Sequence, residues 1–220
     1  MIRYLLVFLF TISSTVIAQE VEQAASSKSG WGVYGGYQSM QISGIEDDAS
    51  DEELEMFETE RLGSFYIGIW KNTDWKIGSL PITVGAELGH RGTKFKTDLE
   101  FPDGESLEMS ADILITYLDL WASANYAMSD KFNLWIGPML GIHLDDKVKF
   151  MGLDLSPVDD AGFNDVDEDL GFNENDFGIL LGAGYSITDN ISINAGLYRG
   201  LKDHDGGKFN NLFIDVGYSF

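Results

Sequence analysis

Eight stretches of the chain alternate apolar residues with small or polar ones, and this alternation constrains the fold more than any other feature. Successive side chains of a strand point to opposite faces, so a period of two predicts eight strands, each with one apolar face. The predicted strands are approximately 30–43, 62–71, 80–96, 107–128, 132–150, 176–187, 191–202 and 209–220.

The alternation has a consequence for the protein's surroundings. After the first 18 residues, no stretch is apolar for the roughly 20 residues that a membrane-spanning helix needs. Lipid satisfies no backbone hydrogen bonds, so strands can cross a membrane only as a closed barrel. The alternation does not say whether the apolar face is turned outward to lipid or inward, as in a soluble lipocalin-like carrier.

The lengths of the connections favour the membrane. Three links are short (72–79, 129–131 and 188–190), and they alternate with links that are mostly longer and more acidic. The link 44–61 carries nine carboxylates, and 145–175 is the longest. This asymmetry is typical of outer-membrane barrels with short periplasmic turns. The sequence therefore predicts an all-β fold: an eight-stranded antiparallel up-and-down transmembrane β-barrel with long acidic extracellular loops.

The N-terminus predicts export. Arg3 precedes an apolar run from Tyr4 to Ile12, and small residues follow as far as Ala18. These are the features of a secretory signal peptide. The predicted division is a signal peptide at 1–18, a short periplasmic segment at 19–29 and the barrel at 30–220, in the cell outer membrane. The chain contains no cysteine, which excludes disulfides and a lipid anchor on cysteine.

Aromatic residues gather near both predicted strand ends, as in the girdles that form at membrane interfaces. The set near the short turns is Trp31, Trp70, Trp75, Tyr126, Phe132, Tyr185, Tyr218 and Phe220. The set near the long loops is Phe95, Phe150, Phe177 and Phe209.

Several stretches resemble a known family. The C-terminal Asp215 to Phe220, with Tyr218 and Phe220 in alternating positions, resembles the signal read by barrel-assembly machinery. Residues 117–120, 135–141, 176–185 and 196–201 resemble strands of the PorT-like outer membrane protein beta-barrel domain family, which is itself similar to the OmpA transmembrane domain. The resemblance implies a Gram-negative outer membrane and a family whose members mostly have no assigned activity.

The face opposite the apolar one predicts a filled interior. In a barrel of eight strands the lumen is just wide enough for side chains to fill it, and buried charges must be paired. The expected lumen polar network is Glu87, Arg91, Asp119, His143, Asn194 and Asp215.

The longest link contains carboxylates at calcium-loop spacing. These are Asp165, Asp167, Asp169 and Asp176, although the glycine of such loops is displaced by one residue to Gly171. The alternatives are weak binding of Ca²⁺ or Mg²⁺ and a simply solvated acidic loop. No other cofactor is expected.

The sequence thus favours a non-enzymatic outer-membrane protein with a structural or surface-interaction role. Its expected partners are outer-membrane lipid, lipopolysaccharide, the assembly machinery and an unidentified surface partner. The formal net charge of −22 argues against nucleic acid. The alternatives are the lipocalin-like carrier and a lipid-modifying barrel enzyme, which would be built around His90 on the lipid-facing side. The sequence places no serine beside His90, and no catalytic residue is assigned.

Overall fold

The computed structural model describes residues 30–43, 58–100, 106–151, 174–204 and 207–220, and these residues form nine strands. The strands are β1 (Trp31–Ser43), β2 (Glu58–Glu60), β3 (Leu62–Ile77), β4 (Leu80–Glu100), β5 (Ser106–Ala127), β6 (Phe132–Met151), β7 (Asp176–Ser186), β8 (Ile191–Gly200) and β9 (Lys208–Ser219).

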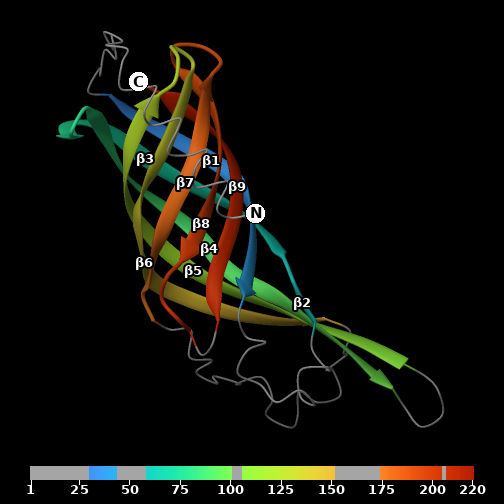
Figure 1. The fold of residues 1–220 in the computed structure, drawn as a ribbon. Coiled ribbons are helices and arrows are strands. Elements are labelled where there is room, and N and C mark those ends of the chain that lie inside the picture. The colour runs from blue at the N-terminus through green and yellow to red at the C-terminus, as the bar shows by residue number, and fades with distance from the viewer. Residues whose placement is uncertain (1–29, 44–57, 101–105, 152–173, 205–206) are drawn as a thin grey trace, which may run out of the picture.

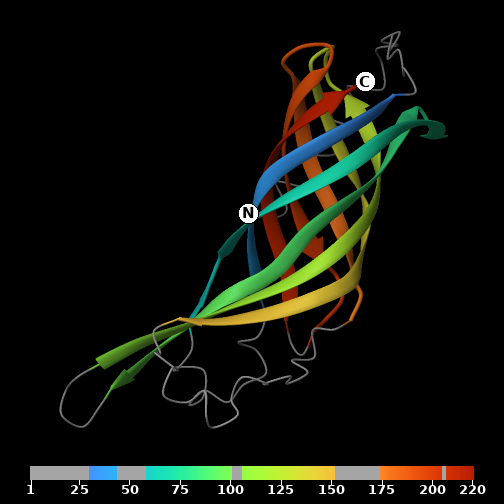
Figure 2. The same cartoon turned by 180° about the vertical axis from the view of Figure 1, so that it is seen from behind.

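The strands close into an antiparallel barrel (Figures 1 and 2). From β3 onward each strand pairs with the next in the chain, and β1 pairs with β3 on one side and with β9 on the other, which closes the ring. The three-residue β2 precedes β3 and pairs with the same partner, β4. Together β2 and β3 occupy one position in the wall, so the barrel is eight-stranded. The predicted eight-stranded barrel is confirmed.

Short turns join the strands at one end of the barrel. Between β3 and β4, Gly78 has φ of 62°, a left-handed conformation that glycine adopts without steric hindrance. The turns after β5 and β7 share one pattern. In each, a hydroxyl oxygen (Ser129 or Thr188) accepts hydrogen bonds from the backbone N–H groups two and three residues later. This end is hereafter the short-turn end.

The strand ends differ from those expected in two places. β3 continues past Lys71 to Ile77 across an irregularity in its pairing with β4 between Asn72 and Lys76. β4 continues past Lys96 to Glu100, where it pairs only with β5. Figure 1 shows this β4–β5 pair projecting beyond the other strands at the end opposite the short turns.

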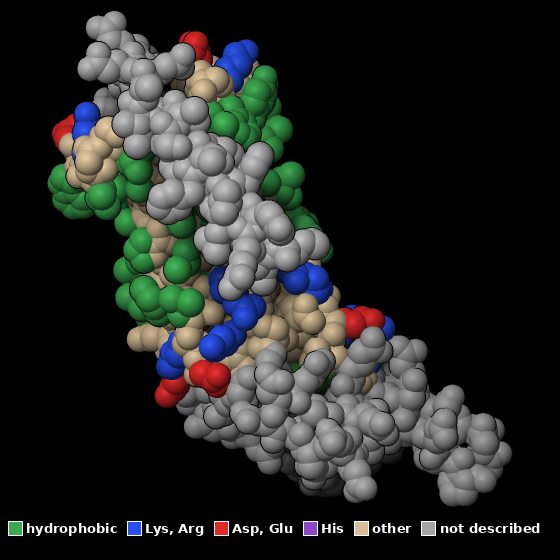
Figure 3. Space-filling view, viewed as in Figure 1, with side chains coloured by type: hydrophobic (Ala, Val, Ile, Leu, Met, Phe, Trp, Pro, Cys, Tyr) green, Lys and Arg blue, Asp and Glu red, His purple; other side chains and the backbone are tan. Residues whose placement is uncertain are grey.

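The apolar face of the strands is turned outward, as predicted. Leu120, Ile193 and Val216 are exposed, whereas Asp119 and Asp215 on the opposite face are buried. Apolar side chains accordingly gather on the outer wall in the space-filling view (Figure 3). An apolar wall around buried carboxylates is the reverse of a soluble carrier and matches a barrel in lipid.

The aromatic residues follow the predicted girdles only in part. Trp31, Trp75, Tyr185 and other members of the short-turn set point outward and are exposed. Three predictions were wrong: Trp70 lines an internal cavity, Phe209 is fully buried inside the barrel, and Phe95 packs against the buried interior cluster. Position along a strand fixes the height of a side chain in the barrel, but its parity fixes the face, and all three residues have inward parity.

Candidate functional site

The interior of the barrel holds the polar side chains in two adjoining clusters. The first cluster, the Arg91 layer, consists of Arg91, Tyr117, Asp119, Asp176, Tyr198 and His204. The second lies closer to the short-turn end and borders a cavity.

Arg91 is held by two carboxylates and two rings. Its Nη2 atom lies 2.7 Å from Asp119 Oδ1, and its Nε atom lies 3.0 Å from Asp176 Oδ2. The Tyr117 and Tyr198 rings face the guanidinium, with their centroids 4.4 and 4.6 Å from Cζ. The buried cation is thus paired and stacked, and its Nη2 atom donates a hydrogen bond, which together offset part of the cost of its removal from water.

Asp176 connects this layer to the last strands. The Tyr198 hydroxyl donates to Asp176 Oδ2 at 2.6 Å, and His204 Nε2 lies 3.2 Å from Oδ1. The Tyr117 hydroxyl donates to the carbonyl oxygen of Glu174 at 3.1 Å. Strands β4, β5, β7 and β8 are therefore tied together across the lumen.

Apolar side chains pack against the Arg91 layer. Ile115 and Phe209 are almost fully buried, and the cluster also includes Ile42, Ile113, Met139 and Leu180. Arg91 pairs across strands with Ile115, and Ile42 pairs with Phe209. The charged layer and this apolar cluster together fill the end of the barrel away from the short turns.

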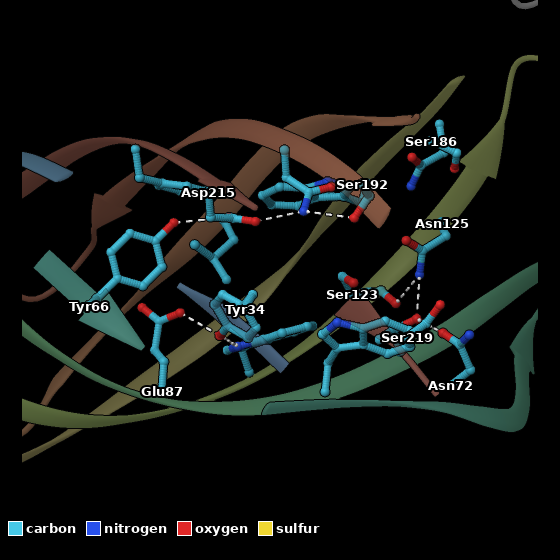
Figure 4. Close-up of a pocket in the computed structure, with 18 of the residues that line it drawn as sticks. Tyr34, Tyr66, Asn72, Glu87, Ser123, Asn125, Ser186, Ser192, Asp215 and Ser219 are labelled. Carbon is cyan, nitrogen blue, oxygen red and sulfur yellow. Dashed lines mark hydrogen bonds between the residues drawn. The ribbon is translucent and has the colours of Figure 1, made fainter. Parts of the chain in front are cut away.

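The second cluster contains two carboxylates bonded by neutral donors (Figure 4). The Tyr34 hydroxyl donates to Glu87 at 2.6 Å. Asp215 accepts from the Tyr66 hydroxyl at 2.9 Å and from the Asn194 amide at 2.6 Å. These groups come from five strands and point into the same space.

That space is a cavity of about 320 Å³. It reaches from Tyr198 and Asn211 to the β7–β8 turn at Thr188 to Asn190, so it lies between the Arg91 layer and the short-turn end. Its volume falls within the range of about 300–1,000 Å³ for ligand pockets.

The remaining predicted residues take other places. The His143 ring packs edge-on against the Tyr117 ring, with the two ring centroids 5.9 Å apart. Its Nε2 atom lies 3.8 Å from Asp146 Oδ1. It contacts the Arg91 layer rather than the second cluster. Tyr218 and Phe220 are exposed on the outer wall with their rings 5.4 Å apart.

The proposed calcium loop is not supported at Asp176. Its carboxylate is buried and engaged by Arg91, Tyr198 and His204, so it does not belong to an outer-loop metal site. Asp165, Asp167 and Asp169 lie outside the described residues. Within the described ranges, no group of three or more potential ligands could hold a metal ion.

A serine does lie beside His90, which sequence reasoning missed. Ser64 Oγ is 2.9 Å from His90 Nδ1. Between residues 62–66 and 89–93 the β3–β4 pairing is interrupted, which lets these two side chains meet. Among the described residues no carboxylate bonds to His90, so the orienting member of a Ser–His–carboxylate triad is lacking there.

Asp176, Tyr117, Tyr198 and His204 were also missed as members of the interior network. Strand parity offered a signal for Asp176, because it immediately precedes the outward-facing Phe177. Nothing in the sequence marked Tyr117 and Tyr198, because the contact of a ring with a cation depends on how the strands are placed.

The comparisons with known proteins agree with the geometry. A family model described as "Outer membrane protein beta-barrel domain" matches residues 17–206. No curated protein matches the chain. No helix in the described part of the chain is long and apolar enough to cross a membrane.

Several solved structures are similar to the chain at low identity. Neisserial surface protein A shares 13% identity over 86% of this chain and 97% of that chain, with a TM-score of 0.44. Ail of Yersinia pestis shares 12% identity over 87% and 99%, with a TM-score of 0.42. The Escherichia coli outer membrane protein W shares 14% identity over 87% and 98%, with a TM-score of 0.41.

Proposed function

The chain belongs to the outer membrane protein beta-barrel domain family, and from this premise we propose that it is a non-enzymatic member acting at the cell surface. It is a protein of the cell outer membrane. Its barrel anchors loops outside the cell and is not a diffusion pore.

The Arg91 layer is the observation that carries this proposal. Arg91, Asp119 and Asp176 are at most 4% exposed, and the apolar cluster packs against them. An open pore would need water in this layer, and charges solvated by such water would not be so buried. A closed lumen leaves the outer surface as the place of function.

The proposal is tested by conductance. The refolded protein in a planar lipid bilayer is expected to give no stable open channel, because the Arg91 layer blocks the lumen. A porin refolded in the same way serves as the positive control. Long-lived unitary currents from the wild-type protein would contradict the proposal.

The acidic outer links are the proposed interaction surface. The link 44–61 carries nine carboxylates, and it would face a phosphate-rich outer leaflet of lipopolysaccharide. Like charges repel, so Ca²⁺ or Mg²⁺ would bridge or screen the two surfaces. The β4–β5 projection would extend this surface toward a partner. We further propose a PorT-like affiliation and recognition of Tyr218 and Phe220 by assembly machinery.

Cation binding by the outer links is measurable by calorimetry. Calcium titrated into the refolded protein is expected to bind weakly, in the millimolar range, and a variant with Asp165, Asp167 and Asp169 changed to Asn is expected to bind less. If the variant and the wild type give equal heats, the residues 165–169 are not the site.

The lipid-modifying enzyme remains the second candidate because of one contact, that between Ser64 and His90. The Ser64 hydroxyl is also within 3.3 Å of the Phe65 carbonyl oxygen, an acceptor that competes for its proton. A Ser64→Ala strain is expected to keep the lipid profile of the wild type. A profile altered as in a deletion strain would instead establish the enzyme.

A further inference from the structure

The cavity between the Arg91 layer and the short turns has an unusual combination of walls. Seven aromatic side chains line it: Tyr34, Tyr66, Trp70, Trp121, Trp135, Tyr198 and Phe213. Three carboxylates also line it: Glu87, Asp189 and Asp215. No Lys, Arg or His occurs among the lining residues that the structure describes.

The two deep carboxylates accept hydrogen bonds from neutral groups. Among the described residues, neither Glu87 nor Asp215 forms a salt bridge, whereas Asp119 and Asp176 are both paired with Arg91. The donors to Glu87 and Asp215 are hydroxyl and amide groups, which stabilise a negative charge without neutralising it. The cavity therefore presents two carboxylates that have no ion-pair partner among the described residues.

The rings are placed around these carboxylates. Trp121 Nε1 donates to the Tyr34 hydroxyl at 2.8 Å, and that hydroxyl donates to Glu87. The Tyr34 ring meets the Tyr66 and Trp121 rings edge-on at 5.9 and 6.2 Å. Trp135 stacks on Phe213 at 5.8 Å. The hydrogen bonds and ring contacts fix the walls before any ligand arrives.

Such walls select one ligand chemistry. An anion would be repelled by Glu87 and Asp215. A neutral apolar molecule would remove water from both carboxylates without replacing it, which is unfavourable. A cation gains from both the carboxylates and the electron-rich ring faces. A cation with an apolar body also fills a volume of about 320 Å³, whereas a metal ion would leave most of it empty.

We propose that this cavity is a binding site for a small organic cation, an amine or quaternary ammonium compound, which enters from the short-turn end. Glu87 and Asp215 neutralise its charge, and the rings of Tyr34, Trp121 and Trp135 cover its apolar part. This site is independent of the outer links and of any surface partner.

The charge requirement is tested with a pair of isosteres. Phenethylamine, a cation at neutral pH, and 2-phenylethanol, which is neutral, are titrated into the refolded full-length protein in lipid nanodiscs. Tryptophan fluorescence and calorimetry report binding, and empty nanodiscs correct for partition into lipid. The amine is expected to bind at least about tenfold more tightly than the alcohol. Equal affinities, or no amine binding at 10 mM, would overturn the proposal.

The location is tested with charge-neutral variants. Glu87→Gln keeps an oxygen to accept the Tyr34 hydroxyl, so the barrel is expected to fold while amine affinity falls about tenfold. Asp215→Asn is a second variant, in which the Asn194 amide can rotate to restore its bond. Asp74→Asn is the control, because Asp74 is exposed and lies outside the cavity while the change in net charge is the same.

The variants give a clear decision. A loss of amine binding in Glu87→Gln and Asp215→Asn, with wild-type affinity in Asp74→Asn, supports the site. Equal loss in all three would mean that the amine responds only to overall charge, and unchanged binding in the two cavity variants would place it elsewhere. Either result overturns the proposal.

Discussion

Arg91 is a single side chain that joins three strands of the barrel. It reaches across the lumen to carboxylates on β5 and β7 and lies between two tyrosine rings. The backbone makes room for it at Gly141, where a Cβ would lie 2.5 Å from Arg91 Nη1 and 2.8 Å from Asp119 Oδ1. A side chain at position 141 would therefore displace the Arg91–Asp119 ion pair.

Removal of the Arg91 charge is expected to be strongly destabilising. Arg91→Met leaves Asp119 and Asp176 buried without their cation, and breaking a buried pair in this way costs about 3–5 kcal/mol. Urea unfolding of the refolded protein in micelles measures the change. The control is Arg199→Met: Arg199 is exposed, so its loss should cost less than about 1 kcal/mol. Similar losses in the two variants would contradict the role given to Arg91.

At the scale of the elements, the junction between β3 and β4 is the irregular part of the wall. The register of β2 against β4 differs by one residue from that of β3 against β4, so the two strands part between Arg61 and Ile67. Side chains take over some of the lost backbone bonds. Gln38 donates to the His90 carbonyl oxygen at 2.7 Å, and Thr93 donates to the Glu60 carbonyl oxygen at 3.0 Å.

Gln38 is expected to stabilise this junction. Gln38→Leu leaves the His90 carbonyl and the Asn211 amide, which donates to Gln38 at 3.1 Å, without partners. A buried unsatisfied group costs about 1–3 kcal/mol. Unfolding should show this loss, and amide exchange should rise in β3 near residues 62–66. Gln41→Leu, at a less buried position of the same strand, is the control and should change little.

At the scale of the whole molecule, the two faces of the wall separate two environments. The outward face carries apolar side chains such as Phe65, which is 77% exposed, and Trp75, which is 68% exposed. In lipid this exposure is favourable, and the carboxylates between the strands are turned inward, where they are paired or hydrogen-bonded. The molecule is stable because lipid, not protein, covers its apolar surface.

Tryptophan fluorescence can test this arrangement. In single-tryptophan variants refolded into brominated lipid, Trp75 is expected to be strongly quenched because it points outward. Trp135 is expected to be quenched little, because it stacks on Phe213 inside the barrel. Stronger quenching of Trp135 than of Trp75 would mean that the faces are reversed.

The sequence by itself determined the number of barrel strands and, where the alternation is regular, the face to which the residues point. Every second residue from Leu212 to Phe220 is apolar, and those residues form the outer wall. The inward position of Glu87, Asp119, Asn194 and Asp215 follows from the same parity. This was predictable because a strand has a strict period of two and lipid forces a closed barrel.

Only the tertiary structure decided which inward residues meet. Asp176 belongs to Arg91 and not to an outer loop, and Ser64 meets His90 because two strands part. Contacts across the lumen depend on the stagger between strands and on irregularities in their pairing, which no single strand encodes. The cavity beside Glu87 likewise results from rings and carboxylates brought together from strands far apart in the chain.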